Sequence, residues 1–263
     1  MKGVFLKKDP GLKIILVDWR DGSFYDQAWY YLSRYFQASN NALMVGRVLA
    51  TFIQRLMSKY NITEKSVHVL GHSLGAQVMG QTVSHLFKSF DIRIGAGTAM
   101  DAASPLFSWK GIEPDRRHVH FMEAVHTSST TNILRVLEGA VGVYAAFADV
   151  NLYPNRGTIY QPACRKNNYF FCSHQRGYIY YLDMVTRCNS NCDFQGSFCE
   201  DVESAVKGIS SERTTDVCDF IRETKDKADG RYNRTSYILT FDTAMDKLNI
   251  RCNNRGHAQY FWI

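Results

Sequence analysis

Residues 67–75 read Val-His-Val-Leu-Gly-His-Ser-Leu-Gly, and this stretch decides the fold. A short apolar run enters a Gly-x-Ser-x-Gly pentapeptide, and the apolar positions from Ala76 to Phe87 then keep helical spacing. Between a strand and a helix, this pentapeptide is typical of a strained turn that exposes a serine hydroxyl at the helix N-terminus. We expect glycine at both flanking positions because side chains there would clash with neighbouring backbone. The pattern predicts Ser73 as a nucleophile, with a purely structural turn as the alternative.

Strand-like and helical segments alternate on both sides of this turn. The β-branched run 13–17 is predicted to be a buried strand, and apolar positions between Ala42 and Leu56 predict an amphipathic helix that ends before 61–64. Residues 92–100 resemble a further strand. The alternation predicts an α/β fold, a mostly parallel sheet with helices on both faces and catalytic groups at the carboxyl ends of its strands. The pattern weakens later, and we assign no elements to 189–227.

Composition limits the kinds of protein that this chain can be. Its 263 residues, 45% of them hydrophobic, are enough for a single α/β domain and too few for a substantial second one. The 31 basic and 25 acidic residues are interspersed, so the net charge of +6 predicts a mild attraction to anionic lipid and no nucleic-acid partner. No segment reaches the length of a membrane span.

The cysteines are confined to the C-terminal hundred residues. The sequence has seven of them, at positions 164, 172, 188, 192, 199, 218 and 252. Such clustering predicts disulfides formed in an oxidising compartment, with reduced core thiols as the alternative. Glycosylation sequons at Asn61 and Asn233 agree with a secreted glycoprotein. Because the number is odd, one cysteine is free or lacks its partner in this sequence.

A serine nucleophile needs a base and an orienting acid, which follow it in this fold in the order Ser, acid, His. Asp101 lies 28 residues after Ser73 at the end of the next predicted strand, and a turn-forming aspartate is the alternative. Histidines that come late enough are His118, His120, His126, His174 and His257. His174 is expected on a loop held by Cys172, although chain order alone does not separate it from His126.

Segments spread along the chain together resemble the animal pancreatic-type lipase family, including its phospholipase A1 branch. These segments are 67–80, 101–107, 153–155, 161–164 and 172–174, in the family's order. The resemblance implies an α/β-hydrolase fold in which Ser73, Asp101 and His174 form the triad, and it implies no cofactor. It also marks the N–H of Leu74 as an oxyanion donor.

The same resemblance assigns roles to neighbouring residues. His126 becomes part of a core strand, and His72 becomes a packed neighbour of the nucleophile. Cys164 and Cys172 match the disulfide that brackets the family's lid. Only residues 165–171 lie between them, too few for a flap that screens the site from water. We therefore expect a phospholipase A1-like or small-ester preference over triacylglycerol, with Tyr169, Phe170 and Phe171 touching an acyl chain or bilayer, or packing against the body as the alternative.

Three departures from the family pattern carry expectations of their own. The segment 115–118 places Arg116 and Arg117 where relatives often hold calcium, so we expect no metal. There is no room for a C-terminal lipid-binding β-sandwich after Ile263. The family's His-Gly-Phe segment, which supplies a second oxyanion donor, is absent upstream of Val17. Together with the odd cysteine and the lack of an export signal, this leads us to expect a single domain over 1–263 that lacks its N-terminal strands.

These observations favour a secreted serine carboxyl-ester hydrolase that acts on lipid esters at a membrane or micelle surface. The alternative is a catalytically silent relative that binds lipid or hormone, like the insect yolk proteins. Such silent relatives have typically lost the serine, whereas the serine is present here. A third interpretation, an unrelated cytosolic esterase, does not explain the cysteine-rich C-terminal region. The sequence predicts no oligomeric state.

Overall fold

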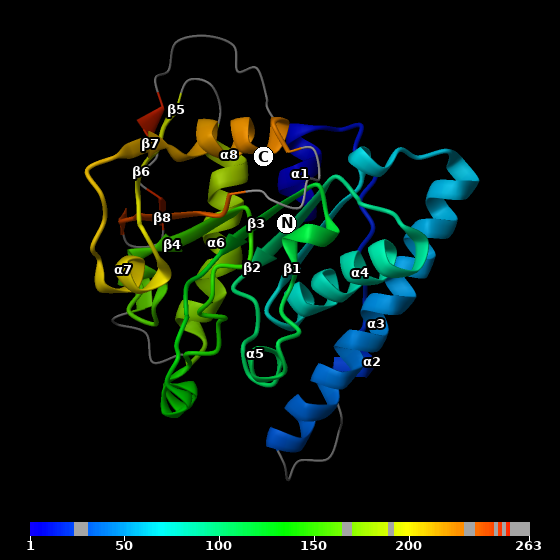
Figure 1. The fold of residues 1–263 in the computed structure, drawn as a ribbon, viewed down its shortest axis with the longest axis horizontal. Helices are drawn as coiled ribbons and strands as arrows, with labels where there is room; N and C mark the ends of the chain where they lie inside the picture. The colour runs from blue at the N-terminus through cyan, green and yellow to red at the C-terminus, as the bar shows by residue number, and fades with distance from the viewer. Residues whose placement is uncertain are drawn as a thin grey trace.

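A seven-stranded sheet covered by helices forms the centre of the computed structural model, which describes residues 1–23, 31–164, 170–188, 192–228, 235–244, 247–248 and 251–252 (Figure 1). The helices are α1 (Lys2–Lys8), α2 (Arg20–Ser23), α3 (Tyr31–Tyr60), α4 (Leu74–Phe90), α5 (Phe107–Lys110), α6 (Cys172–Arg187), α7 (Val202–Lys207) and α8 (Val217–Asp226). The strands are β1 (His68–His72), β2 (Ala96–Met100), β3 (Phe121–Val125), β4 (Val150–Pro154), β5 (Cys192–Asp193), β6 (Gln195–Phe198), β7 (Thr214–Asp216), β8 (Tyr237–Phe241), β9 (Thr243–Ala244), β10 (Lys247–Leu248) and β11 (Arg251–Cys252).

The strand order of the main sheet is β1-β2-β3-β4-β8-β6-β7. The first five of these strands run parallel to one another, whereas β6 pairs antiparallel with both β8 and β7. Parallel strands connected by helices bring their carboxyl ends to one edge of the sheet. The predicted mostly parallel α/β fold is confirmed.

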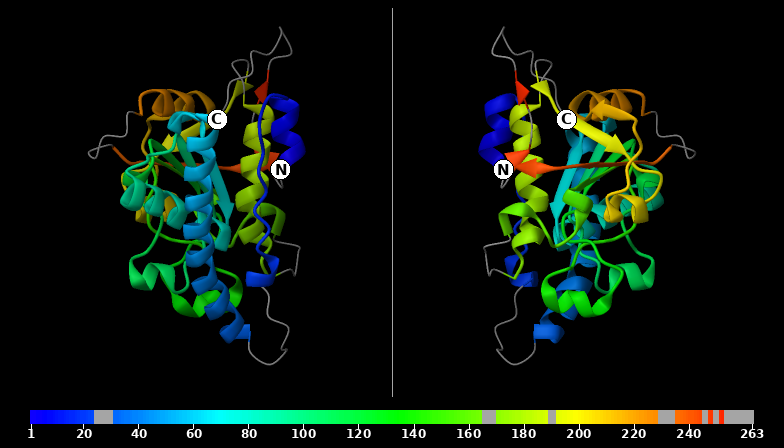
Figure 2. Two further views of the ribbon diagram at one scale, coloured as in Figure 1. Left: turned by 90° about the vertical axis from the view of Figure 1, so that its right-hand side faces the viewer. Right: turned by 90° about the vertical axis from the view of Figure 1, so that its left-hand side faces the viewer.

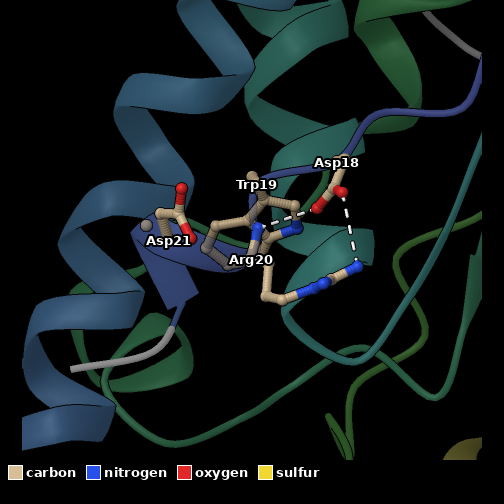
Figure 3. A pocket seen from close by; sticks show the side chains of 5 residues that line it. Asp18, Trp19, Arg20 and Asp21 are labelled. Atoms are coloured by element: carbon tan, nitrogen blue, oxygen red, sulfur yellow. Dashed lines mark hydrogen bonds and ion pairs between the residues drawn. The ribbon is translucent and has the colours of Figure 1, made fainter. Parts of the chain in front are cut away.

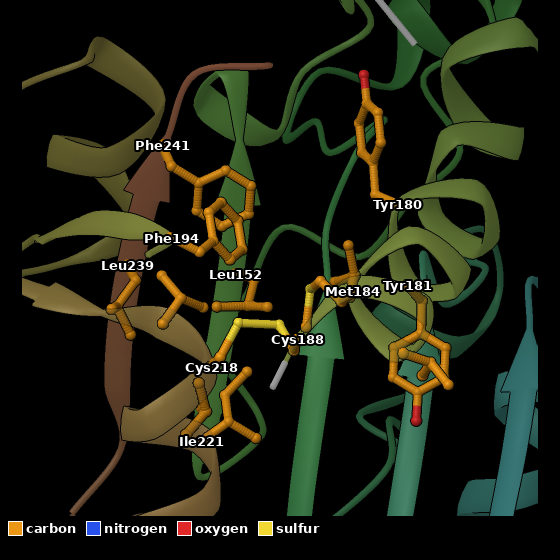
Figure 4. Packing of buried hydrophobic residues seen from close by; sticks show 14 of the residues in the cluster. Leu152, Tyr180, Tyr181, Met184, Cys188, Phe194, Cys218, Ile221, Leu239 and Phe241 are labelled. Carbon is orange, nitrogen blue, oxygen red and sulfur yellow. A yellow bond between two sulfur atoms is a disulfide. The ribbon is translucent and has the colours of Figure 1, made fainter. Parts of the chain in front are cut away.

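Alternate residues of the central strands face two separate apolar layers. On β3, Phe121 and Val125 pack into a cluster with α6 and α8, whereas Met122 and Ala124 pack into a second cluster with α3 and α4. Figure 2 shows α3 and α6 on opposite sides of the sheet, and Figure 4 shows the first cluster, which includes the Cys188–Cys218 disulfide. Each central strand is thus covered on both faces, as parallel sheets require.

The prediction of a buried strand over 13–17 is wrong. Residues 12–19 form neither helix nor strand, and Ile15 and Leu16 are 53% and 69% exposed. Within the described residues, the sheet ends at β1, whose ladder partner is β2. An apolar β-branched run indicates hydrophobicity and a preference for extended backbone. It becomes a buried strand only where a neighbouring strand offers free hydrogen-bonding groups.

The predicted helix between Ala42 and Leu56 is confirmed and is longer than its apolar pattern, since α3 spans Tyr31–Tyr60. It ends at Asn61, whose φ of 50° places it in the left-handed region that terminates helices. The predicted strand over 92–100 is shorter in the structure, because β2 begins at Ala96. None of the helices in the described ranges is long and apolar enough to cross a membrane.

The C-terminal region, to which the sequence assigned no elements, contains β6, β7, α7 and α8. Its helices are short and begin at aspartate caps, with Asp201 accepting from the Ser204 N–H and Asp216 from the Asp219 N–H. The predicted use of cysteines in disulfides is confirmed by two pairs, Cys164–Cys172 and Cys188–Cys218. Cys199 is a buried free thiol, and the β5–β11 ladder sets the backbone of Cys252 opposite that of Cys192.

Candidate active site

Ser73 occupies the turn between β1 and α4. Its φ of 58° and ψ of −123° lie outside the usual regions for a residue with a side chain, as a strained strand-to-helix turn requires. The turn is held from both sides, because the Ser73 N–H donates to the Met100 carbonyl and the Ser73 carbonyl accepts from the Ala103 N–H. Both partners flank Asp101, so the backbone ties the Ser73 turn to the segment that follows β2.

The two glycines of the pentapeptide have different reasons to be there. A Cβ at Gly71 would lie 2.0 Å from the carbonyl oxygen of Gly75, so the first position accepts no side chain. A Cβ at Gly75 would meet nothing within 4 Å. The expectation that both glycines avoid a backbone clash is therefore confirmed for Gly71 and wrong for Gly75. The backbones of Gly71 and Gly75 approach each other closely, and this contact requires a glycine only at position 71.

Asp101 directly follows β2 and is fully buried. Its Oδ1 accepts the backbone N–H groups of Thr127 at 2.7 Å and Ser128 at 3.1 Å. Its Oδ2 accepts the Ser128 hydroxyl at 2.5 Å and lies 2.6 Å from Nδ1 of His174. The carboxylate thus has four donors, which is the kind of surrounding that stabilises a buried negative charge.

His174 is brought to Asp101 by α6, in whose first turn it lies. The structure therefore selects His174 over His126 as the histidine that contacts Asp101. The expectation of a loop is wrong, because His174 lies on a helix, where it is buried. The Cys164–Cys172 disulfide anchors the start of that helix, so the cysteine does constrain the imidazole.

The surroundings of Asp101 favour its ionised form beside His174. Burial by itself would raise the pKa of Asp101, but the hydrogen bond and charge of His174, followed by the Ser128 and Thr127 donors, lower it below its usual value. Asp101 is accordingly a carboxylate at neutral pH. Its bond to Nδ1 leaves Nε2 as the nitrogen of His174 that can exchange a proton with another group.

His72, the residue before Ser73, packs against His174. Its ring centroid is 4.7 Å from that of His174, and its Nε2 lies 2.9 Å from the His174 carbonyl oxygen. Burial, followed by the nearby His174, lowers the pKa of His72 to about 4, so this ring is neutral at physiological pH and donates to that carbonyl. The expectation of a packed neighbour fits this geometry. His72 fixes the start of α6 relative to the Ser73 turn.

Three residues around Asp101 were not singled out from the sequence. Ser128 Oγ, besides its bond to Asp101, lies 3.4 Å from Nδ1 of His174. A Cβ at Gly142 would lie 2.5 Å from Asp101 Oδ1, and one at Gly177 would lie 2.8 Å from Asp101 Cβ. The close contacts of Gly142 and Gly177 hold the Asp101 carboxylate in one position. No sequence pattern marks them, because they come from segments far from Asp101 along the chain.

The other candidate histidines lie elsewhere. His126 is buried at the end of β3, with Nδ1 3.0 Å from the Val143 carbonyl oxygen and its ring stacked on Tyr153 at 4.3 Å. His118 and His120 precede β3, at the opposite edge of the sheet from Asp101. His257 is outside the described residues.

The segment expected to lack a metal contains its own ion pair. The Arg117 guanidinium binds both oxygens of Asp115, at 2.9 Å from Nε and 2.6 Å from Nη2. Among the residues that the structure describes, no group of three or more His, Cys, Asp or Glu side chains could hold a metal ion.

A small pocket of about 340 Å³ lies at residues 18–22 (Figure 3). Its lining comes from one local turn, in which Arg20 contacts Asp18, and includes none of Ser73, Asp101 and His174. Since the lining is mostly polar and contiguous in sequence, we do not place a substrate there.

Exposed apolar side chains gather near His174. Phe170 and Phe171 are exposed, and the Phe171 ring centroid lies 6.1 Å from that of His174. The 3₁₀ turn η3 (Ile133–Glu138) exposes Leu134 and Leu137 and ends at Gly139, where a Cβ would lie 2.1 Å from the Phe170 carbonyl oxygen. These four residues form what we call the apolar rim. Tyr169 and the rest of 165–169 lie outside the described residues.

This geometry can be set beside known proteins. Residues 4–245 match the family model described as Lipase. The chain belongs to the Lipase family. The predicted resemblance is thereby confirmed, and the sheet with its Ser73 turn is that of an α/β-hydrolase.

Individual members of the Lipase family align with most of the chain. Pancreatic triacylglycerol lipase of Cavia porcellus is 27% identical over 253 residues, which cover 89% of this chain and 50% of that protein. Lipase member H of Danio rerio is 30% identical over 281 aligned positions, with 98% of this chain and 56% of that protein covered. The chain spans about half the length of these relatives.

Proposed function

We propose that this chain is the catalytic α/β-hydrolase domain of a serine carboxyl-ester hydrolase that acts on lipid esters. The observation that carries the proposal is the Asp101–His174 contact of 2.6 Å, which lies at the carboxyl edge of the sheet beside the strained Ser73 turn. A buried carboxylate that orients an imidazole next to a serine on such a turn is the arrangement that activates a hydroxyl for attack on an acyl group.

The proposed reaction has two halves. Ser73 Oγ attacks the ester carbonyl while Nε2 of His174 accepts the hydroxyl proton, and Asp101 stabilises the imidazolium that forms. The backbone N–H of Leu74, at the first position of α4, faces the oxygen on which negative charge develops. Collapse expels the alcohol, which takes the proton back from His174. Water then attacks the acyl-enzyme by the same route and releases the fatty acid.

The apolar rim supports a lipid substrate. Phe170, Phe171, Leu134 and Leu137 present large apolar side chains to solvent around the edge of the site, and a soluble protein rarely gathers them without a partner. An acyl chain or the surface of a lipid aggregate is such a partner. The rim would hold the ester next to Ser73 while the rest of the lipid stays in its aggregate.

We further propose a phospholipase A1-like or small-ester preference over triacylglycerol. The Cys164–Cys172 disulfide closes a segment of only seven residues, 165–171. A loop of that length is too short for a helical flap that would shield the site until it meets an oil surface. The relatives include both triacylglycerol lipases and Lipase member H, so they leave this choice to experiment.

The disulfides also support secretion. Cys164–Cys172 and Cys188–Cys218 persist only in an oxidising compartment, such as the secretory pathway and the extracellular space. Asn61 of the first sequon is exposed at the end of α3, where a glycan could be attached, whereas Asn233 is outside the described residues.

The test compares three substrates with purified protein: a soluble short-chain ester, dispersed phospholipid and emulsified triacylglycerol. We expect hydrolysis of the first two to exceed that of the third, and the Ser73→Ala variant to hydrolyse none. Activity that survives Ser73→Ala would refute the mechanism. A strong triacylglycerol preference, with a rise in rate at the oil interface, would refute only the substrate preference.

A further inference from the structure

The helix α3 exposes large apolar side chains on the side that faces away from the sheet. Met44 and Val48 are 60% and 62% exposed, and Phe36 and Phe52 are nearly half exposed. Met44, Val48 and Phe52 follow one another at intervals of four residues and so lie along one side of the helix. Scattered single hydrophobic residues need no explanation, but a row of them along one helix does.

These side chains are not needed to hold α3 in place. Its inner side, with Ala50, Ile53 and Met57 buried, packs against α4 in the second apolar cluster. At the crossing, a Cβ on Gly46 would lie 2.6 Å from Gln81 Cβ, so the two helices are already in close contact. The helix is therefore apolar on two sides, and only one of them is used by the fold.

The charged residues of α3 and α4 are all basic. Residues 31–60 contain no Asp or Glu, and α4 contains none either. The basic residues of the two helices are Arg34, Arg47, Arg55, Lys59 and Lys88. Arg47 and Arg55 are exposed, lie on the same side as Met44 and Val48, and form no ion pair among the described residues. Among the described residues, Asp21 lies on α2, which packs beside α3 where Asn41 donates to the Gly22 carbonyl at 2.7 Å, and Glu64 and Asp91 follow the C-terminal ends of α3 and α4.

The N-terminal end of α3 reaches the candidate active site. The Tyr35 hydroxyl donates to the Pro105 carbonyl at 2.9 Å, and Pro105 belongs to the loop that follows Asp101. In Figure 1, α3 runs along one side of the molecule, with this end near α5. A surface that engages the outer side of α3 would thus come close to the edge of the sheet where Ser73 lies.

We infer that the outer face of α3 docks the protein on an anionic lipid surface. By this face we mean Phe36, Met44, Arg47, Val48, Phe52 and Arg55. Apolar side chains between arginines, with no acidic residue among them, match the boundary of a bilayer, where acyl chains lie beneath negative headgroups. The inference goes beyond the proposed catalysis, because docking through α3 needs none of the triad residues.

The test is flotation of the full chain with vesicles of phosphatidylcholine alone and with vesicles that also contain phosphatidylserine. We expect stronger binding to the second kind, and weaker binding as salt screens the charges. Arg47→Glu combined with Arg55→Glu should lower binding to the anionic vesicles by at least about tenfold. Circular dichroism should be unchanged, because both side chains are exposed.

The matched control is Lys2→Glu with Lys7→Glu, two exposed lysines on α1, which packs with α6 on the other side of the sheet. It changes the net charge equally and should change binding by less than about twofold. A second pair of variants tests the apolar part: Val48→Gln should weaken binding, whereas Ile209→Gln, exposed on the loop after α7, should not.

Each contrary result overturns the inference. Equal loss of binding in the α1 and α3 variants would mean that net charge alone determines binding. Equal binding to both kinds of vesicle would mean that the protein does not recognise anionic headgroups. Sedimentation that shows a dimer dissociated by the α3 variant, with vesicle binding unchanged, would assign the face to a second copy. Flotation of Ser73→Ala should equal that of the wild type, so failure of the proposed catalysis would leave this test intact.

Discussion

Two buried carboxyl groups on neighbouring strands behave in opposite ways. Asp101 follows β2 at the carboxyl edge of the sheet, and Glu123 lies within β3, under α6. Both are fully buried, yet the pKa of Asp101 is lowered and that of Glu123 is raised. Burial penalises the charge of both groups, so by itself it does not explain the opposite directions.

The number of donors explains it. Asp101 accepts four hydrogen bonds, including one from a histidine that can carry positive charge. Glu123 has two hydroxyl donors, Thr98 at 2.7 Å from Oε1 and Tyr181, and among the described residues its Oε2 has no hydrogen-bond partner. Thr98 in turn lies 2.7 Å from Nε2 of His68, whose pKa burial lowers to about 3. One cluster therefore favours the charged carboxylate and the other the neutral acid, although both combine a carboxyl, a hydroxyl and an imidazole.

The largest effect should come from the residues that exchange the proton. Ser73→Ala and His174→Ala should each lower kcat for ester hydrolysis by on the order of 10⁴-fold or more, and the double variant should lose little beyond either single one, because the residues act as a unit. Steady-state kinetics on a soluble ester measure this. Losses that multiply in the double variant would show that the two residues act independently.

Replacing each carboxyl by its amide tests the roles of the two clusters separately. Asp101→Asn should lower kcat by about 10⁴-fold, because an amide orients the imidazole in the wrong tautomer and cannot stabilise the imidazolium. Glu123→Gln should change kcat by less than about twofold, since burial already favours the neutral form of Glu123 and the group lies away from the Ser73 turn. Comparable losses in both variants would contradict the assignment of charge to one cluster alone.

Removing a donor from Asp101 should have an intermediate effect. Ser128→Ala leaves the carboxylate with three donors and a freer position, and we expect kcat/KM to fall about tenfold. With one donor fewer, the negative charge of Asp101 stabilises the His174 imidazolium more strongly. The acid limb of the pH–rate profile should therefore move to higher pH.

Ser128→Thr is the control for this positioning residue, because it keeps the hydroxyl. It should restore most of the rate and return the acid limb to its original pH. A loss of rate in Ser128→Ala without any displacement of the profile would mean that Ser128 supports packing and does not tune the pair.

The smallest effect concerns stability. The raised pKa of Glu123 means that its contribution to stability is complete below the usual carboxyl pKa and is lost as the pH rises through the folded value. Gln does not ionise. The free energy of unfolding of Glu123→Gln, relative to that of the wild type, should therefore rise by about 1 kcal/mol between pH 4 and pH 8. Thermal unfolding at both pH values measures the gain. A difference that is the same at each pH would exclude ionisation of Glu123 as its cause.

Residues at strand ends could be predicted from the sequence, whereas residues that contact them from other segments could not. Ser73 and Asp101 were predicted because each follows a strand directly, and the strand end fixes where the side chain lies. His174 needed the family resemblance, because several histidines satisfy the chain order. Ser128 could not have been found, since it meets Asp101 only through the packing of β3 beside β2. Sequence alone thus locates the residues at strand ends and misses those that surround them.

The fold shows the same limit. The helical spacing of α3 and the run into the Ser73 turn are local patterns, and both predictions were confirmed. The strand expected at 13–17 was wrong, because strand formation depends on a partner that the run itself does not encode. The short elements between 195 and 226 escaped prediction because α7 has only six residues, less than two full turns of periodicity.

One measurement tests the central claim most directly, namely labelling with an active-site phosphonate followed by peptide mapping. We predict a single adduct on Ser73, formed at the same rate in the wild type and Glu123→Gln and slowed by on the order of 10⁴-fold in Asp101→Asn. An adduct on another residue, or equal labelling rates in all three proteins, would contradict it.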